Sequence, residues 1–346
     1  MTDPIHIDGS QGEGGGQLLR TAVALAAITG RPLRIEHIRA RRPQPGLAAQ
    51  HLAAVRAVGS ACNARFEGVE LRSTAMTMQP GRLCGGGFAF DVGTAGSITL
   101  VLQALLPVLA CCGADATVTV GGGTDVTSAP PLDYFRAVTL ALLARMGLRA
   151  NLVVHRRGYY PRGGGQVTLR SFASRLRPVD FTAGSLRPIR GVAHVAGISL
   201  DIGHRMRKAC LDALGEDVSP RAQIELVELG RDDAVGKGGA IVAWCDAGPS
   251  VIGCGQVAQR GILAERLGQA VGSQLRSDLA ADATLDVHAA DQVLIYLALA
   301  GGGSFTTRRL STHAQTAVWL IEQFLPVRFD VVAQGALVRV RVARRA

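Results

Sequence analysis

Lysine is almost absent from this chain of 346 residues. Only Lys208 and Lys237 occur, so arginine supplies nearly all of the 37 basic side chains, which face 27 acidic ones for a net charge of +10. The forked guanidinium of arginine suits phosphate oxygens better than a point-like ammonium does. The charge therefore favours a phosphate-rich partner, although the codon bias of a GC-rich genome would produce the same surplus.

Cysteine pairs, signal segments and membrane spans are also lacking. The seven cysteines form no Cys-x-x-Cys motif and their number is odd, which favours a reduced, cytoplasmic protein. The start has no basic segment followed by an apolar one, so no signal peptide is expected. The uncharged run 92–114 contains Gln103 and Pro107 and predicts a buried helix rather than a membrane span. The histidines lack zinc-binding spacing, so no structural metal is expected.

Helix-turn-strand units recur along the chain. Apolar residues make up 48% of the sequence and charged residues 18%, so the chain is folded and long enough for two domains. Apolar helices, each followed by a glycine or proline turn and a β-branched strand, are predicted within 18–38, 98–120, 134–155 and 316–332. Their irregular spacing argues against a solenoid. We expect an α/β (α+β) fold of similar subdomains packed together.

The segment from about 187 to 280 breaks this rhythm. It predicts strands at 191–198, 223–229 and 240–245 and a helix at 206–214, which is typical of an inserted domain. An irregular stretch at 171–188, with several arginines and prolines, would be its entry linker. At the end of the chain, valines alternate with arginines over 338–342, as in a half-exposed edge strand.

A glycine-rich loop at residues 9–20 runs into an apolar helix. Backbone amides there, with the helix dipole, can hold phosphate oxygens, but a structural turn has the same composition. The loop is not a P-loop, because the Lys-Ser/Thr ending is missing, and Gln17 stands where Gly-x-Gly-x-x-Gly requires its last glycine. Glu13 inside the loop would need a metal ion or an arginine between its carboxylate and a phosphate.

Arginines gather on a second loop, Arg39-Ala-Arg-Arg-Pro-Gln-Pro-Gly46, just before Gln50 and His51. Proline and glycine exclude a helix there, so the arginines directly follow a predicted strand. This arrangement suits a terminal phosphate, and a solvated charge cluster is the alternative. The glycine-rich loop at 121–131 also follows a strand, but alone it indicates no function.

One histidine stands at the start of a predicted helix. Ser311 or Thr312 can cap this helix, which puts His313 in its first turn. The positive end of the helix dipole disfavours imidazolium and leaves a neutral ring nitrogen able to attack phosphorus. Without further context, a histidine in this position is a capping or surface residue.

Six motifs in order give the chain a family resemblance. They are residues 12–20, 39–47, 50–51, 121–125, 290–292 and 313–316. Together they strongly resemble the RNA 3'-terminal phosphate cyclase family over nearly the whole chain. The resemblance implies a large catalytic domain, 1–186 and 280–346, of three repeated subdomains similar to the C-terminal domain of translation initiation factor three. It also implies a small thioredoxin-like inserted domain at 187–279.

The resemblance also implies an ATP-dependent reaction of RNA. His313 would attack the α-phosphate of ATP, AMP would pass to the RNA 3'-phosphate to give RNA(3')pp(5')A, and the 2'-hydroxyl would displace AMP to close a 2',3'-cyclic phosphodiester. Adenylylation gives the terminal phosphate a leaving group. Glu13 would hold Mg²⁺ or Mn²⁺. The RNA 3'-phosphate would be bound by Arg20, Arg39, Arg42, Gln50 and His51, and ATP by Gln103, Pro130, His288, Ala289, Ala290, Asp291 and Gln292.

Two departures from the family pattern concern the adenine side. His288 stands where the family usually has a tyrosine before its Asp-Gln pair, and Ile252 stands near the position of an aromatic residue in the insert. We expect an altered nucleotide preference rather than lost chemistry, because the adenine face contributes to binding more than to phosphorus attack.

Three other functions fit the sequence less well. A non-catalytic relative that binds RNA in ribosome assembly would lack the nucleophile His313. Enolpyruvyl transferases, which resemble this fold distantly, need no histidine at a helix start, and ATP-dependent labelling separates them. Lysine-based ligases carry a Lys-x-Asp-Gly motif, which neither Lys208 nor Lys237 begins.

Overall fold

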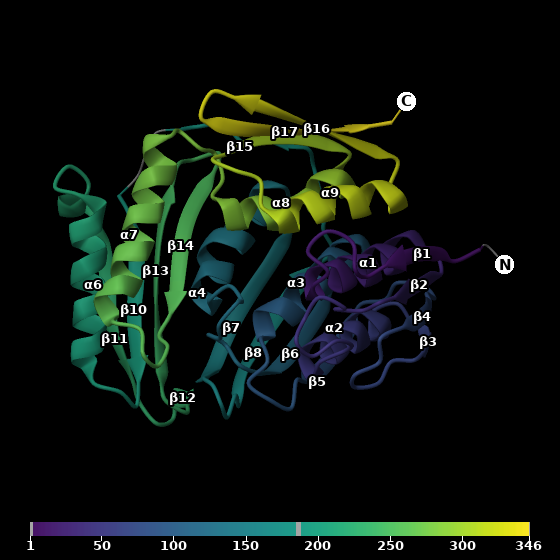
Figure 1. The fold of residues 1–346 in the computed structure, drawn as a ribbon, viewed down its shortest axis with the longest axis horizontal. Helices are drawn as coiled ribbons and strands as arrows, with labels where there is room; N and C mark the ends of the chain where they lie inside the picture. Colours follow the sequence, from purple (N-terminus) through teal and green to yellow (C-terminus); the bar gives the residue numbers. More distant parts are fainter. Residues whose placement is uncertain (1–2, 185–187, 346) are drawn as a thin grey trace.

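Three units of the same topology make up most of the protein (Figure 1). The computed structural model describes residues 3–184 and 188–345. Each unit runs strand, helix, strand, helix, strand, strand. Within each unit the first two strands pair in parallel, and the other neighbouring strands of the same unit pair antiparallel. The structure therefore confirms a mixed α/β fold and the recurring helix-turn-strand pattern.

The first unit has the sheet order β1-β2-β4-β3 and contains β1 (Ile5–Asp8), α1 (Gly16–Thr29), β2 (Leu33–Glu36), α2 (Ala49–Ser60), β3 (Arg65–Glu67) and β4 (Met76–Gln79). The second has the order β5-β6-β8-β7 and contains β5 (Gly86–Asp91), α3 (Ile98–Cys111), β6 (Ala116–Gly122), α4 (Leu132–Tyr134), η1 (Phe135–Thr139), α5 (Leu140–Arg145), β7 (Arg149–Gly158) and β8 (Gly165–Phe172). The third has the order β9-β15-β17-β16 and contains β9 (Val179–Asp180), α8 (Val287–Ala300), β15 (Gly302–Thr307), α9 (Thr312–Phe324), β16 (Val327–Gln334) and β17 (Leu337–Arg344).

A fourth sheet interrupts the third unit and has a different topology. Its order is β11-β10-β13-β14, so its first strand is central rather than at an edge. Helices α6 and α7 lie side by side against it and share with it a buried cluster of their own, from Ile189 to Leu275. Its elements are β10 (Arg190–Ala196), α6 (Leu200–Leu214), η2 (Ser219–Arg221), β11 (Gln223–Leu229), β13 (Gly238–Asp246), β14 (Val251–Val257) and α7 (Ala264–Ala280), while β12 (Ala234–Val235) pairs with β7.

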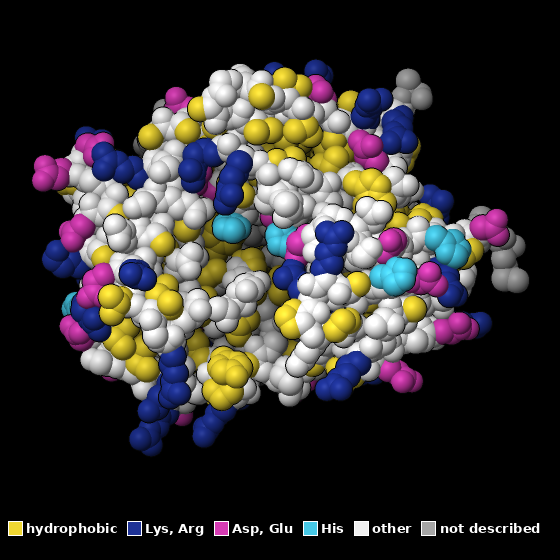
Figure 2. Space-filling view, in the orientation of Figure 1, with side chains coloured by type: hydrophobic (Ala, Val, Ile, Leu, Met, Phe, Trp, Pro, Cys, Tyr) yellow, Lys and Arg dark blue, Asp and Glu magenta, His cyan; other side chains and the backbone are white. Residues whose placement is uncertain are grey.

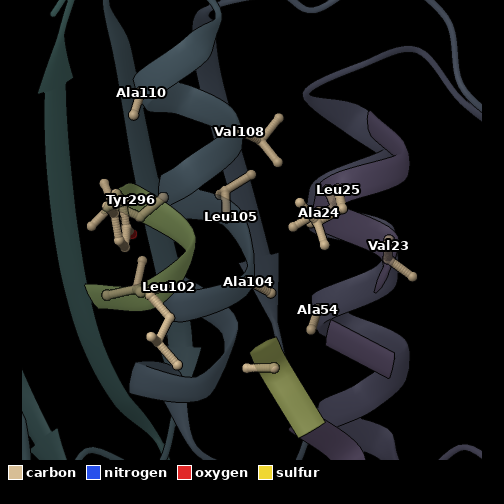
Figure 3. Packing of buried hydrophobic residues seen from close by; sticks show 14 of the residues in the cluster. Val23, Ala24, Leu25, Ala54, Leu102, Ala104, Leu105, Val108, Ala110 and Tyr296 are labelled. Carbon is tan, nitrogen blue, oxygen red and sulfur yellow. The ribbon is translucent and has the colours of Figure 1, made fainter. Parts of the chain in front are cut away.

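The main core lies where the helices of the three units meet. Figure 3 shows Leu105 and Val108 of α3 pointing toward Ala24 and Leu25 of α1. Alanines at such contacts let the helix axes approach closely, and all four side chains are buried. Helix α3 is buried along its length, as predicted for the uncharged run 92–114. In the described residues no helix is long and apolar enough to cross a membrane.

Three sequence-based expectations need correction. The C-terminal strand β17 is not an edge strand, because it pairs with both β15 and β16. The helix predicted from residue 134 begins at Leu132 and contains the π-helical turn η1. The predicted linker 171–188 is partly regular, since β8 extends to Phe172 and Val179–Asp180 form β9, while residues 185–187 lie outside the described residues.

Candidate active site

A cleft of about 650 Å³ opens between the inserted sheet and the helices of the three units. Figure 2 shows this face hollowed near its centre, in front of α4. Twelve of the fourteen predicted site residues line the cleft: Glu13, Arg20, Arg39, Arg42, Gln50, His51, Gln103, Pro130, His288, Asp291, Gln292 and His313. Sequence motifs spread over some 300 residues thus meet in one place, which no local pattern could establish.

With α4, η1 and α5 counted as one continuous helix, each of the three units contributes the N-terminal ends of two helices to this cleft. Its lining includes residues from the first turns or N-terminal caps of α1, α2, α3, α4, α8 and α9, among them Gly16, His51, Leu100, Pro131, His288 and His313. A helix N-terminus carries roughly half a positive charge and unpaired backbone amides. Their convergence makes the cleft suited to anions before any side chain is considered.

The glycine-rich loop holds Glu13 against two partners. One carboxylate oxygen contacts Arg42 and the other contacts Nδ1 of His313. The backbone amide of Glu13 donates to Thr316 Oγ1 at 3.4 Å, which ties the loop to α9. Gly12 has φ 58°, and a β-carbon there would collide with Thr316. The glycines are therefore required for the loop to reach α9.

His313 lies in the first turn of α9, as predicted. Ser311 is the cap, because its Oγ accepts from the amide of Ala314 at 3.0 Å. Burial, together with Arg20 and Arg42, lowers the pKa of His313, against the opposing effect of Asp291. The ring is therefore neutral near pH 7, with Nδ1 against Glu13.

Asp291 connects α8 to this helix start. Ser311 Oγ donates to Asp291 Oδ1 at 2.7 Å. Burial raises the pKa of Asp291 to about 6, although Ser311 and His313 both favour the ionised form. Near pH 7 its carboxylate contributes negative charge beside His313.

Basic side chains also line the cleft. Arg39 follows β2 with φ 55° and donates to Gly46 O at 2.7 Å, which holds the predicted arginine loop in place. His51 Nδ1 accepts from the amide of Ala48 at 3.3 Å, so its other nitrogen carries the proton. Burial and the nearby Arg20, Arg39 and Arg42 lower the pKa of His51 to about 3. His51 is thus a neutral donor among cations.

Three residues named from the sequence do not lie in the cleft. Ala289 and Ala290 are fully buried within α8, where the amide of Ala289 donates to the capping carboxylate of Asp286 at 2.9 Å. Ile252 packs in the core of the inserted sheet instead of bordering a base. The insert contributes Gly255, Gln256, Val257 and Gln259 to the cleft, and sequence reasoning missed these four.

A buried ionic network anchors the wall formed by residues 126–131. Arg157 of β7 donates to Asp125 Oδ2 at 3.1 Å and to Asp133 Oδ2 at 2.7 Å, and these carboxylates stand just before and just after that wall. Arg157 also donates to Nε2 of His194 on β10, at 3.1 Å, and Nδ1 of His194 lies 3.0 Å from Tyr159 Oη. One guanidinium thus joins the cleft wall to the inserted sheet.

Known proteins show the same sequence pattern. The family model for RNA 3'-terminal phosphate cyclase matches residues 11–331. This chain belongs to that family. It is 53% identical over 339 residues to the RNA 3'-terminal phosphate cyclase of Nitrosospira multiformis, covering 97% of this chain and 96% of the relative. It is 43% identical over 335 residues to the cyclase of Methanopyrus kandleri, covering 94% and 95%.

A solved structure gives a much weaker match. The enolpyruvyl transferase NikO from Streptomyces tendae aligns with 100% of this chain and 49% of its own, at a TM-score of 0.38 and 14% identity. That likeness is too low to support a functional argument. The cyclase family membership rests on the sequence matches alone.

Proposed function

We propose that this protein is an ATP-dependent RNA ligase-type enzyme that converts an RNA 3'-terminal phosphate to a 2',3'-cyclic phosphodiester. The observation that carries the proposal is His313, which faces the cleft from a helix start with Nδ1 against Glu13. Membership of the cyclase family and the similarity to proteins named RNA 3'-terminal phosphate cyclase support it.

His313 would be the nucleophile. With its proton held on Nδ1, against Glu13, the lone pair of Nε2 would be free to attack the α-phosphate of ATP. An N–P bond forms while the P–O bond to pyrophosphate breaks. The RNA 3'-phosphate oxygen then takes AMP from His313. Finally the 2'-oxygen forms a bond to the RNA phosphorus, loses its proton and releases AMP, which closes the cyclic phosphodiester.

The two ends of the cleft would take the two substrates. Arg20, Arg39, Arg42, Gln50 and His51 offer charged and neutral donors for a terminal phosphate. Gln103, Pro130, His288, Asp291 and Gln292 would border ATP. The glutamines of the insert, Gln256 and Gln259, face the same space, so the base would meet amides rather than an aromatic ring on that side.

A divalent metal fits Glu13 as a single protein ligand. Oε1 of Glu13 is buried and contacts only the guanidinium of Arg42, without a hydrogen bond. In the described residues no cluster of three or more His, Cys, Asp or Glu side chains could hold a metal alone. Mg²⁺ is commonly held by one or two carboxylates together with substrate phosphates, which suits this site. When bound, Mg²⁺ or Mn²⁺ would neutralise charge on the triphosphate.

The domain division is also part of the proposal. Residues 187–279 would form an inserted thioredoxin-like domain, supported by its separate buried cluster. Residues 1–186 and 280–346 would form the large domain, with three subdomains similar to the C-terminal domain of translation initiation factor three. Their shared strand order supports this proposal.

The test is protein labelling. Incubation with α-labelled ATP and Mg²⁺ or Mn²⁺, followed by denaturation, should leave label that is labile in acid and stable in alkali, as expected for a histidine phosphoramidate. His313→Ala should abolish the label, while His37→Ala, an exposed histidine outside the cleft, should retain it.

Label that persists in His313→Ala would refute the assignment of the nucleophile. A folded wild-type protein that takes no label but binds RNA would instead be the non-catalytic binding relative considered above.

A further inference from the structure

The turn between β7 and β8 carries an exposed aromatic side chain beside the cleft. Tyr160 is 78% exposed, in a protein with only 4% aromatic residues. Arg156 and Arg162 flank it and are also exposed. Arg156 Nε donates to Gly164 O at 3.1 Å, and within residues 3–184 and 188–345 neither arginine pairs with a carboxylate. Nothing in the turn itself explains an unburied tyrosine between two unpaired cations.

Packing joins this turn to the phosphate end of the cleft. A β-carbon at Gly163 would lie 3.0 Å from Cα of Ala95, so the turn rests on the loop before α3. A β-carbon at Gly96 would lie 3.0 Å from Cβ of Gln50, and the amide of Ser97 donates to Gln50 Oε1 at 3.2 Å. Gln50 lines the cleft, so one short loop separates the cleft from the turn. In Figure 1 the two strands turn at the lower edge, below the hollow of Figure 2.

The connecting loop consists of small residues, and the carboxylate of Asp91, which contacts it, accepts from the amide of Gly93 at 2.8 Å. Residues 93–96 are Gly-Thr-Ala-Gly, with no charge and no bulky side chain. Gly93 and Thr94 are exposed. A chain whose terminal phosphate lies among Arg39, Arg42 and His51 can therefore leave the cleft over this loop and reach the turn.

An exposed aromatic ring with exposed arginines close to it in the sequence has the chemistry of a stacking platform. Nucleobases stack on such rings whatever their sequence, and neighbouring arginines neutralise phosphates. A protein partner would be expected to cover a larger apolar surface than one ring. The continuity with the phosphate end of the cleft favours the RNA strand itself.

We propose that Tyr160, with Arg156 and Arg162, binds the single-stranded RNA upstream of the 3'-phosphate, one base stacking on the tyrosine ring. This inference rests on the proposed cyclase function. The proposed contact makes binding depend on RNA length. Substrates of a few nucleotides contact the cleft only, and longer strands also contact the turn.

The test compares long and short RNAs. For a 3'-phosphorylated RNA of roughly ten nucleotides, Tyr160→Ala should raise KM about 5- to 150-fold, the range expected for loss of one base–aromatic stack. For a 3'-phosphorylated dinucleotide, KM should not change. Tyr160→Trp should retain wild-type KM for the long RNA, and Arg162→Ala should lower the salt dependence of its binding.

Two controls separate this inference from the proposed function. Phe172→Ala removes another exposed aromatic residue at the far end of β8 and should leave both KM values unchanged. Labelling of His313 by ATP without RNA should be unaffected by Tyr160→Ala. If Tyr160→Ala leaves KM for the long RNA unchanged, or raises KM for both substrates equally, the platform is refuted. If no variant and no wild-type protein takes label, the proposed function itself has failed.

Discussion

Replacing Arg157 should strongly destabilise the protein near neutral pH. Arg157→Met keeps most of the side-chain volume but leaves Asp125 buried without its arginine partner, while Asp133 keeps only one arginine partner, Arg136. Both carboxylates are almost inaccessible to solvent. Removing one partner of a buried ion pair costs about 3–5 kcal/mol. With an unfolding entropy of about 2.1 cal/mol/K per residue, that corresponds to a fall of about 4–7 °C in the unfolding midpoint, measured by circular dichroism.

The loss should depend on pH with a definite sign. Burial alone would raise the pKa of Asp125, but Arg157 and His194 outweigh it and lower that pKa. In the wild type, Asp125 therefore stabilises the fold above its unfolded pKa of about 3.9, and this contribution is lost as pH falls through the lower folded value. Without Arg157, burial should raise the pKa of Asp125 in the folded variant. Protonation of Asp125 then removes the buried negative charge, so the variant should recover stability as pH falls. The difference between the unfolding midpoints of the wild type and Arg157→Met should therefore become smaller from pH 8 toward pH 4.

A matched variant controls for loss of a surface charge. Arg205→Met breaks exposed pairs with Asp201 and Glu265 and should leave the midpoint nearly unchanged. Adding Asp125→Asn and Asp133→Asn to Arg157→Met should restore part of the stability, because the buried negative charge is removed. A midpoint loss in Arg157→Met no larger than in Arg205→Met, or the same at pH 5 and pH 8, would refute the reasoning.

Two further predictions concern the cleft. Because burial and the nearby arginines lower the pKa of His313, labelling by ATP should stay constant from about pH 8 to below pH 6.5, and initial rates that fall with a midpoint at or above 6.5 would contradict this. Arg39→Ala should raise KM for RNA about 10- to 150-fold with labelling retained. Arg42→Ala should raise KM for RNA and also lower labelling, since Arg42 contacts Glu13 as well. Equal effects of the two variants on labelling would count against separate roles.

Local features of the site were predictable from the sequence. Ser311 caps α9 and His313 follows in its first turn because capping depends on residues only a few positions apart. The arginine loop after β2 was predictable for a similar reason, since Pro43 and Pro45 exclude a helix at that point. Local patterns predicted the secondary structure around these residues, and the family resemblance then implied their functional roles.

Other features depend on neighbours that the sequence pattern does not specify. Alternation in β17 reports that one face is exposed, but not whether both edges are paired. Ile252 was misplaced because β14 is buried on both faces over Val251–Cys254, so no alternation indicates which side meets the cleft. The contact of Arg157 with His194 joins residues from different sheets, and no local sequence pattern predicts such a contact.

The repeated units explain why the motifs lie so far apart in the chain. Each strand-helix-strand-helix unit brings two helix starts to the same end of its sheet, and three units packed together direct six of them at one cleft. Every helix adds roughly half a positive charge there, so all three units contribute to the positive potential of the cleft. Arg20, Arg39 and Arg42 add to that field, while Glu13 and Asp291 are the exceptions, and both lie beside His313. The acidic side chains of the cleft lining are thus confined to the surroundings of His313, a distribution that fits its proposed role as the nucleophile.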